Sequence, residues 1–236
     1  MDALIIRLKG AMAAWGTLTV GDNRETAAAP SQSALLGMLG ACCGIDRRDS
    51  ERLDRWFNLW HTVILYVTRR RGEVQPRRFY DFHSARNTLK LNGDLNTDPQ
   101  IGYRGYLQEA LAIVAFVLRE RSDPRLQSLA RTCLEAPVYT PYLGRLCNPF
   151  SAPPFLKQGS YESLSTLLAD MQRLLLTESS EQEGAVTHMR RIVPQALVAR
   201  CGERIGGMTE VLPDRRNGAV MSYRDHYCLT LEIALP

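Results

Sequence analysis

The stretch PSQSALLGMLGACCGI, residues 30–45, predicts a helix with a well-defined start. Pro30 prevents a helix from continuing in from upstream, because its ring clashes with the preceding turn and it lacks an N–H group. Either Ser31 or Ser33 can then cap the free N–H groups of the first turn. At the other end, Gly44 suits the left-handed conformation in which many helices terminate. We therefore expect one helix that begins after Pro30 and ends just before Gly44.

The face of this helix that lies opposite its apolar side chains carries Gly37 and Gly40. Each interior glycine costs about 1 kcal/mol relative to alanine, so a solvated helix face normally uses other residues. One interpretation is that a nucleic-acid backbone or a neighbouring protein approaches this face closely. The other is that both helix faces are buried within the protein and glycine makes room. The helix alone leaves both interpretations open.

The composition is that of an ordinary globular protein of 236 residues, with 45% hydrophobic and 23% charged residues. No apolar run approaches the roughly 20 residues of a membrane span, and the N-terminus lacks the apolar segment of a signal peptide. The six cysteines form neither a CxxC pair nor a zinc-binding spacing, which favours buried reduced thiols in a cytoplasmic protein. We expect no metal, no cofactor and no membrane association.

The positive charge is concentrated in one segment. The chain carries a net charge of +4, and residues 69–104 alone hold eight basic and four acidic residues, which is the same excess. All but three of the 29 basic residues are arginine. Arginine presents a planar set of donors that suits phosphates and base edges, although codon bias in a GC-rich genome explains the arginine content equally well.

Within this segment, residues 77–83 (RRFYDFH) interleave basic and aromatic side chains. Turn signals follow at residues 92–94 and 98–99, and apolar residues are sparse between 84 and 102. The pattern predicts an extended hairpin or protruding loop. Arginine for phosphates and aromatic rings for stacking is the chemistry of a single-stranded nucleic-acid contact, and a merely solvated loop is the alternative.

The order of predicted elements indicates an α+β protein. Strands are expected at residues 3–9, 61–68 and 110–118, and helices at residues 30–45, 50–58 and from Asp123-Pro124 onward. With a closing strand this is the ferredoxin-like (RRM-like) βαββαβ pattern used by RNA-recognition domains. Residues 161–176 are predicted to be helical and to finish in a strand at 174–176, and residues 186–200 and 220–235 are predicted strands. We expect two parts, residues 1–150 and a small β-rich C-terminal extension, 151–236.

Several ordered motifs lie within residues 4–150. They are Leu8-x-Gly10-x-Met12-x-Ala14-Trp15-Gly16, Arg24-x-Thr26, Pro30-x-x-Ser33-x-Leu35-Leu36-Gly37-x-Leu39-Gly40-Ala41-Cys42, Tyr80-x-Phe82-His83, Tyr103-Arg104-x-Tyr106-Leu107 and Tyr139-Thr140-Pro141-Tyr142-Leu143-Gly144-Arg145. Together they resemble the CasD family of type I-E CRISPR Cascade subunits, which belongs to the RAMP superfamily. The chain departs from the family pattern at Ala11, where proline is common, and at Ala28, where a basic residue is common.

This resemblance implies a non-catalytic RNA-binding subunit of a cytoplasmic antiviral ribonucleoprotein. Such a subunit caps the 5′ handle of the CRISPR RNA (crRNA), and its thumb insertion, here about residues 78–104, reaches across the RNA to the adjacent backbone subunit. The implied partners are the crRNA handle, that backbone subunit and the large subunit. Target DNA is contacted only indirectly, through the complex.

The residues predicted to bind RNA come from the glycine-faced helix and its preceding loop, from the basic segment, and from the motif around Tyr142. They are Trp15, Arg24, Ser31, Gln32, Ser33, Gly37, Gly40, Arg77, Arg78, Tyr80, His83, Arg86, Arg104, Tyr106, Tyr142 and Arg145. Trp15 remains open between stacking on a base and packing in the core.

No catalytic motif is evident, and the four histidines lie in different segments. An alternative is a metal-independent endoribonuclease, in which His83 acts with Tyr80 and Lys90 on a 2′-hydroxyl. Type I-C relatives of the same family process RNA, so this alternative is kept.

Overall fold

The computed structural model describes residues 1–17, 22–71, 73–90, 92–119, 123–180, 184–203, 205, 207–217 and 222–235. These residues hold five helices, which are α1 (Gln32–Cys42), α2 (Ser50–Leu59), α3 (Pro124–Glu135), α4 (Leu164–Ser179) and α5 (Gln195–Cys201). The strands are β1 (Asp2–Ala13), β2 (Trp15–Gly16), β3 (Thr26–Ala27), β4 (Trp60–Arg70), β5 (Glu73–Val74), β6 (Arg77–Ala85), β7 (Thr88–Leu89), β8 (Leu95–Asn96), β9 (Gln100–Leu118), β10 (Phe155–Ser160), β11 (Val186–Pro194), β12 (Met208–Asn217) and β13 (Ser222–Ala234). In the described part of the chain, no helix is both long and apolar enough to cross a membrane.

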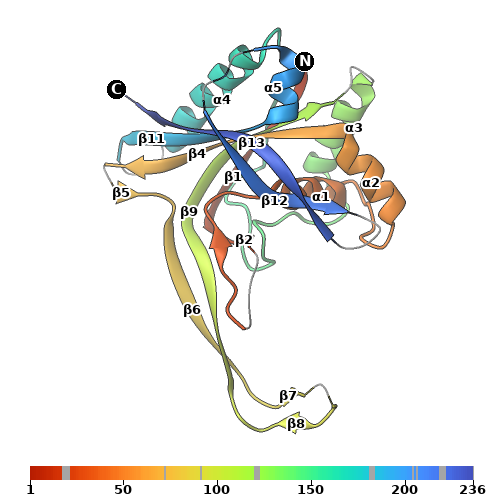
Figure 1. Ribbon diagram of the computed structural model, residues 1–236, viewed down its shortest axis with the longest axis vertical. Coiled ribbons are helices and arrows are strands. Elements are labelled where there is room, and N and C mark those ends of the chain that lie inside the picture. Colours follow the sequence, from red (N-terminus) through yellow and green to blue (C-terminus); the bar gives the residue numbers. More distant parts are fainter. Residues whose placement is uncertain are drawn as a thin grey trace.

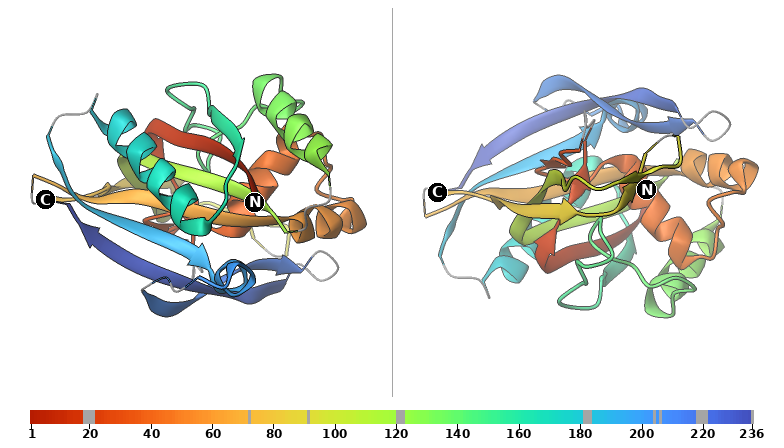
Figure 2. Two further views of the ribbon diagram at one scale, coloured as in Figure 1. Left: turned by 90° about the horizontal axis from the view of Figure 1, so that it is seen from above. Right: turned by 90° about the horizontal axis from the view of Figure 1, so that it is seen from below.

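The main sheet is antiparallel and curled, with the strand order β10-β1-β9-β4-β11-β13-β12 (Figures 1 and 2). β5 adds to β4, and β6 adds to β9 beyond the edge of the sheet proper. The α+β class predicted from the sequence is therefore confirmed.

Helices cover both faces of this sheet because the side chains of a strand alternate between its faces. In β1, Leu4 and Ile6 pack in a core beneath α1, α2 and α3. Ala3 and Ile5 point to the other face and pack in a second core beneath α4. The sheet is thus buried on both sides, and the signal that predicts its central strands is their nearly continuous run of apolar residues.

The ends of α1 follow the sequence signals. Ser31 is the N-cap, and its hydroxyl accepts a hydrogen bond of 3.1 Å from the N–H group of Ala34. Gly44 has a φ of 71°, which is the left-handed conformation predicted for it. At the start of α3, the side chain of Asp123 caps the helix and Pro124 occupies its first turn, also as predicted.

The C-terminal third differs from its predicted secondary structure. α4 continues through residues 174–176 to Ser179, because Leu167, Met171 and Leu175 repeat at the helical spacing and all lie buried on the sheet. Residues 195–201 form α5 and not the end of a strand. The strand predicted at 220–235 is β13. Residues 220 and 221 of that prediction lie outside the described part of the chain.

The described residues between 151 and 235 do not build a sheet of their own. β10 pairs with β1 at one edge of the main sheet, and β11 pairs with β4 on the other side. The boundary suggested near residue 150 therefore does not coincide with a break in hydrogen bonding. Local sequence patterns do not predict this pairing, because the paired strands are more than a hundred residues apart in the chain.

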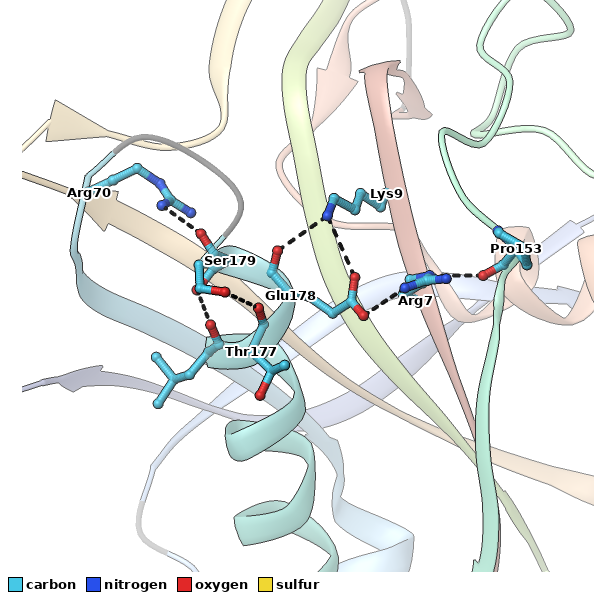
Figure 3. Close-up of polar contacts among 9 residues, drawn as sticks. Arg7, Lys9, Arg70, Pro153, Thr177, Glu178 and Ser179 are labelled. Carbon is cyan, nitrogen blue, oxygen red and sulfur yellow. Dashed lines mark hydrogen bonds and ion pairs between the residues drawn. The ribbon is translucent and has the colours of Figure 1, made fainter.

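Basic residues anchor the last turn of α4 to the sheet (Figure 3). The Glu178 carboxylate lies 2.7 Å from Nη1 of Arg7 and 3.6 Å from Nζ of Lys9. Arg70, which is buried, donates to the carbonyl oxygen of Ser179 at 3.2 Å. Cations at this end of a helix are stabilising, because the unpaired carbonyl groups there carry partial negative charge.

A long hairpin projects from the sheet (Figure 1). It consists of β6, β7, β8 and the first part of β9, residues 77–90 and 92–107, and is called the hairpin below. β9 changes its partner from β4 to β6 as it leaves the sheet, and Glu109 at that position has a φ of 50°.

Candidate nucleic-acid interface

The base of the hairpin is widened by a third segment that comes from the loop before α1. The N–H group of Arg24 donates to the carbonyl oxygen of Tyr103 at 2.8 Å, and the N–H group of Gly105 donates to the carbonyl oxygen of Arg24 at 2.8 Å. Arg24 therefore lies beside Arg104 as a short parallel bridge. Two exposed arginines that are 80 positions apart in the sequence meet at this point.

Arg145 joins them from a third segment. Its guanidinium lies over the ring of Tyr106, 4.3 Å from the ring centre, and donates to the carbonyl oxygen of Arg24 at 3.2 Å. The buried side chain of Asn148 holds this segment in place by donating to the carbonyl oxygen of Leu143 at 3.2 Å. Arg145 is thus positioned by the fold, and less conformational entropy is lost when such a side chain binds a phosphate.

Close backbone contacts fix the same segment against β1. Gly144 has a φ of 86°, and a Cβ atom there would lie 1.7 Å from the carbonyl oxygen of Ala14. A Cβ atom at Gly10 would lie 2.9 Å from the backbone carbonyl oxygen of Pro149 and 2.4 Å from the side chain of Leu143. Both positions require glycine, which gives a physical reason for the Gly residues in the two motifs.

Two of the aromatic residues in the predicted set form part of the scaffold. Trp15 is 5% exposed and packs in the core beneath α1 to α3. The structure therefore supports core packing of this ring and not stacking on a base. Tyr106 is also 5% exposed and stacks on Phe79, with 5.2 Å between ring centres. Neither ring has a free face for stacking on a base in this arrangement.

Tyr80 is the exposed aromatic residue of the predicted set on β6. Its hydroxyl donates to the Glu25 carboxylate at 3.0 Å, and this hydrogen bond with the nearby negative charge raises the pKa of Tyr80 above its ordinary value. Tyr142, on the segment that carries Arg145, is also exposed. Both rings remain accessible to an unpaired base.

The hairpin has two chemically different faces, because side chains alternate along β6 and pair in register with β9. One face presents large apolar and aromatic side chains, each about half exposed, namely Tyr80, Phe82, Ile101 and Tyr103. The other carries Asp81, His83 and Arg104. Of the four residues on the apolar and aromatic face, the predicted set contains Tyr80 and misses Phe82, Ile101 and Tyr103. A count of every second residue along 78–84 and 101–107 would have found all three.

The remaining basic residues of the hairpin differ in their surroundings. Arg77 forms an ion pair with Glu73, whereas Arg78 and Arg86 are exposed along the hairpin. Nε2 of His83 lies 2.7 Å from the Asp81 carboxylate on the same face of β6. Tyr80 points to the opposite face, so the grouping of His83 with Tyr80 that the endoribonuclease alternative needs is not formed within β6.

The start of α1 contributes hydroxyls and one open glycine. The hydroxyls of Ser31 and Ser33 lie 3.0 Å apart, both partly exposed. Gln32 is buried, and its amide donates to the carbonyl oxygen of Trp60 at 3.4 Å, so its side chain faces the protein interior. A Cβ atom at Gly37 would have no neighbour within 4 Å.

Gly40 proves to be different from Gly37. A Cβ atom there would lie 3.2 Å from Nε1 of Trp56 on α2. Of the two interpretations of the glycine face, burial within the protein therefore applies to Gly40, and close approach by a partner remains for Gly37 alone.

Among the described residues, no three His, Cys, Asp or Glu side chains come together in a group that could hold a metal ion. All six cysteines are free; Cys42 and Cys228 are buried, whereas Cys147 is exposed, unlike the burial expected of every thiol. Burial raises the pKa of Cys42 to about 11, with a smaller contribution from the neighbouring Cys133.

Comparison with known proteins gives consistent matches. The family model described as CRISPR-associated protein (Cas_Cas5) matches residues 3–211. CRISPR system Cascade subunit CasD of Escherichia coli (strain K12) is 35% identical over 158 residues, which is 65% of this chain and 69% of that protein.

Two solved structures share the fold. A chain of a CRISPR RNA-guided surveillance complex superposes with a TM-score of 0.68 at 21% identity, over 99% of this chain and 91% of the other. The crystal structure of a Cas protein gives a TM-score of 0.56, also at 21% identity, over 99% and 95% of the two chains.

Proposed function

This chain belongs to the CRISPR-associated Cas5 family, and on that premise we propose that it is a non-catalytic RNA-binding subunit of a type I-E Cascade surveillance complex. In this proposal it caps the 5′ handle of the crRNA and contacts the adjacent backbone subunit and the large subunit. Target DNA is reached only through the assembled complex. Free thiols suit a cytoplasmic assembly of this kind.

The observation that carries the proposal is the meeting of Arg24, Arg104 and Arg145 at the base of the hairpin. These residues come from three separate segments and are joined by the backbone hydrogen bonds of Arg24. Guanidinium groups bind phosphates through paired donors, and three arginines brought to one place by the fold offer a track for an RNA backbone.

Neighbouring features extend this track in two directions. The exposed rings of Tyr80 and Tyr103, on the face of the hairpin opposite Arg104, offer stacking surfaces for bases of an RNA that passes around the hairpin. The open face at Gly37 lets a sugar–phosphate backbone approach α1 without meeting a side chain. The proposed RNA path therefore runs from α1 across the hairpin base.

We further propose that the antiparallel order β10-β1-β9-β4, with α1 and α3 on one face, is a ferredoxin-like unit that carries the hairpin as its thumb. In a βαββαβ unit, the last strand lies beside the first and the third lies between the first and the second. The order here has that form when β1 is the first strand of the unit, β4 the second, β9 the third and β10 the last.

The test is a binding and cleavage assay with the full chain. Labelled CRISPR repeat RNA, with its 5′ handle processed, is compared with an unrelated strand of equal length, with chelator present. Arg145→Ala is expected to weaken handle binding about tenfold, because it removes both a phosphate donor and the contact with Tyr106. The matched control is Arg131→Ala, which removes another arginine stacked on a ring, 4.8 Å from the centre of Phe155. Arg131 belongs to α3, which lies away from the hairpin (Figure 1).

If both variants lose the same amount of RNA affinity, Arg145 is not part of the RNA-binding site. Intact RNA in every reaction supports the non-catalytic role. Site-specific cleavage that His83→Ala abolishes would instead assign the endoribonuclease activity.

A further inference from the structure

Residues 22–25, called the strap below, lie along one edge of β9. The backbone groups of Arg24 bond to the carbonyl oxygen of Tyr103 and the N–H group of Gly105, and the Asn23 side chain accepts the N–H group of Tyr103 at 3.0 Å. Alternate residues of a strand direct their backbone groups to opposite edges, so Tyr103 and Gly105 face the strap and not β6. The base of the hairpin is therefore a three-stranded surface in the order β6, β9 and strap.

The side chain of Tyr80 crosses this surface from β6 to the strap. Tyr80 pairs in register with Gly105 of β9, and its hydroxyl reaches the Glu25 carboxylate at 3.0 Å. Gly105 leaves room for the ring, whose Cε1 atom lies 3.4 Å from the place that a Cβ atom would occupy. One side of the ring is thus turned to the backbone of β9. The other side is open, because Tyr80 is 52% exposed.

Two charged groups lie beside the open ring. Glu25 accepts the Tyr80 hydroxyl through Oε2, and within the described residues its Oε1 receives no hydrogen bond. Arg78 is exposed and lies two residues before Tyr80 on the same face of β6. The hydrogen bond to Glu25 raises the pKa of Tyr80, and the positive charge of Arg78 acts in the opposite direction, which places that charge near the ring. An aromatic platform, an acceptor and a cation therefore lie together.

An exposed carboxylate is unexpected on a surface that binds RNA, because it repels phosphates. The groups of RNA that attract a carboxylate are the donors of the bases, and glutamate accepts hydrogen bonds from base amino groups. Adenine presents an acceptor nitrogen beside its amino group, and uracil presents carbonyl oxygens on both sides of its N–H group. Guanine alone presents two adjacent donors, N1–H and the N2 amino group. The acceptor at the edge of the ring therefore suits guanine.

We propose that Tyr80, Glu25 and Arg78 bind one unpaired nucleotide and that Glu25 selects guanine. The base stacks on the open side of the Tyr80 ring, its N1–H and N2 amino groups donate to the Glu25 carboxylate, and a phosphate pairs with Arg78. The Tyr80 hydroxyl is a positioning group, because it fixes the carboxylate at the edge of the ring. This inference rests on the proposed RNA-binding function and adds a base preference to it.

The nucleotide site is separable from the arginine cluster. Arg104 lies on the opposite face of the hairpin, and Arg145 lies over Tyr106 on that same opposite face. Contacts with phosphates carry no sequence information, whereas contacts with base edges do. Substitutions in the arginine cluster should therefore weaken binding of all RNA strands alike, and substitution of Glu25 should change the ranking of the strands.

The experiment measures fluorescence anisotropy of the full chain with labelled eight-nucleotide uridine strands that carry one central guest base. The guests are guanine, adenine and hypoxanthine, which keeps N1–H but lacks the amino group. All three are purines, so differences in stacking are small. We expect the guanine strand to bind about tenfold tighter than the adenine strand, with the hypoxanthine strand between them.

The variants test which groups carry this preference. Glu25→Gln replaces one acceptor oxygen by a donor and should reduce the ratio of guanine to adenine affinity to about two or less. Tyr80→Phe keeps the ring, frees the carboxylate, and should lower the same ratio. Asp22→Asn is the matched control, because it neutralises another strap carboxylate, which accepts a hydrogen bond of 3.0 Å from Gln100. It should keep the full ratio.

Each contrary result identifies a different error. Equal affinity for the guanine and adenine strands, or an unchanged ratio in Glu25→Gln, overturns the guanine site. If Glu25→Gln fails to fold, Tyr80→Phe decides, and a full ratio in that variant overturns the positioning of the carboxylate. Equal affinity for guanine and hypoxanthine contradicts the paired donors. Absence of binding to every strand counts against the RNA-binding proposal itself, whereas binding without base preference overturns this inference alone.

Discussion

At the scale of the residue, Asp170 shows how hydrogen bonds outweigh burial. Burial alone would raise its pKa, but hydrogen bonds from Lys157, Tyr161 and Arg173 hold the pKa of Asp170 at about 2. Lys157 lies 2.7 Å away on β10, and the Tyr161 hydroxyl 2.5 Å away. This carboxylate joins α4 to the edge strand of the sheet.

A pH dependence of stability follows from this carboxylate. The pKa of Asp170 in the folded state lies below its unfolded value of about 3.9. The contribution of this carboxylate to the free energy of unfolding is therefore complete above about pH 4 and is lost as the pH falls toward 2. This difference between the folded and unfolded pKa corresponds to about 2 kcal/mol in the free energy of unfolding. We expect Asp170→Asn to lose less stability than the unmodified chain between pH 4 and 2, measured by urea unfolding at each pH. Asp98→Asn, an exposed carboxylate in the hairpin, is the control, and an unchanged pH profile in Asp170→Asn would contradict the argument.

At the scale of the element, the two glycines of α1 lead to different predictions for substitution by alanine. Alanine at Gly37 meets no neighbour within 4 Å, so Gly37→Ala should raise the free energy of unfolding by about 1 kcal/mol through helix propensity. Gly40→Ala should gain less, because its methyl group would press on Trp56, whose indole is fixed by a hydrogen bond of 3.0 Å to the carbonyl oxygen of Leu36. Urea unfolding of both variants measures the difference.

The same pair of variants tests the RNA path over α1. If RNA lies against the open face, Gly37→Ala should weaken handle binding although it stabilises the protein, and Gly40→Ala should bind as before. A more stable Gly37→Ala variant with full RNA affinity would place the RNA elsewhere.

Elements with strong local signals were predictable from the sequence. The cap at Ser31, the Asp123-Pro124 start of α3 and the apolar strand at 110–118 all depend on neighbouring residues. The contact of Arg24 with Arg145 is a hydrogen bond from a guanidinium to a backbone carbonyl oxygen 121 positions away, and only the family resemblance placed both residues in one site. α5 was missed because Val198 and its neighbours suit a strand as well as a helix, and packing decided between them.

At the scale of the whole molecule, the hairpin tip is separable from the fold. Replacing residues 86–99 by Asn-Gly would close the pair Ala85 and Gln100 with a two-residue turn. Leu89 and Leu95 at the tip are 74% and 61% exposed, so we expect a change below about 1 kcal/mol in the free energy of unfolding. Co-purification with the adjacent backbone subunit should be lost.

A variant of full length provides the control for this truncation. Leu89→Asn with Leu95→Asn keeps the hairpin length and removes only the apolar tip. Retained co-purification in the truncated chain would show that the backbone subunit binds elsewhere on the molecule.

β9 has a mechanical consequence. Its 19 residues divide into eight that belong to the hairpin (100–107), two at its base (108 and 109), and nine in the body of the sheet (110–118). At about 3.3 Å per residue the outer part is about 26 Å long and the inner part about 30 Å, so one strand reaches a similar distance outward and inward. Because β1 pairs with β9 on both sides of Glu109, a displacement of the hairpin is carried along one continuous strand into the centre of the sheet.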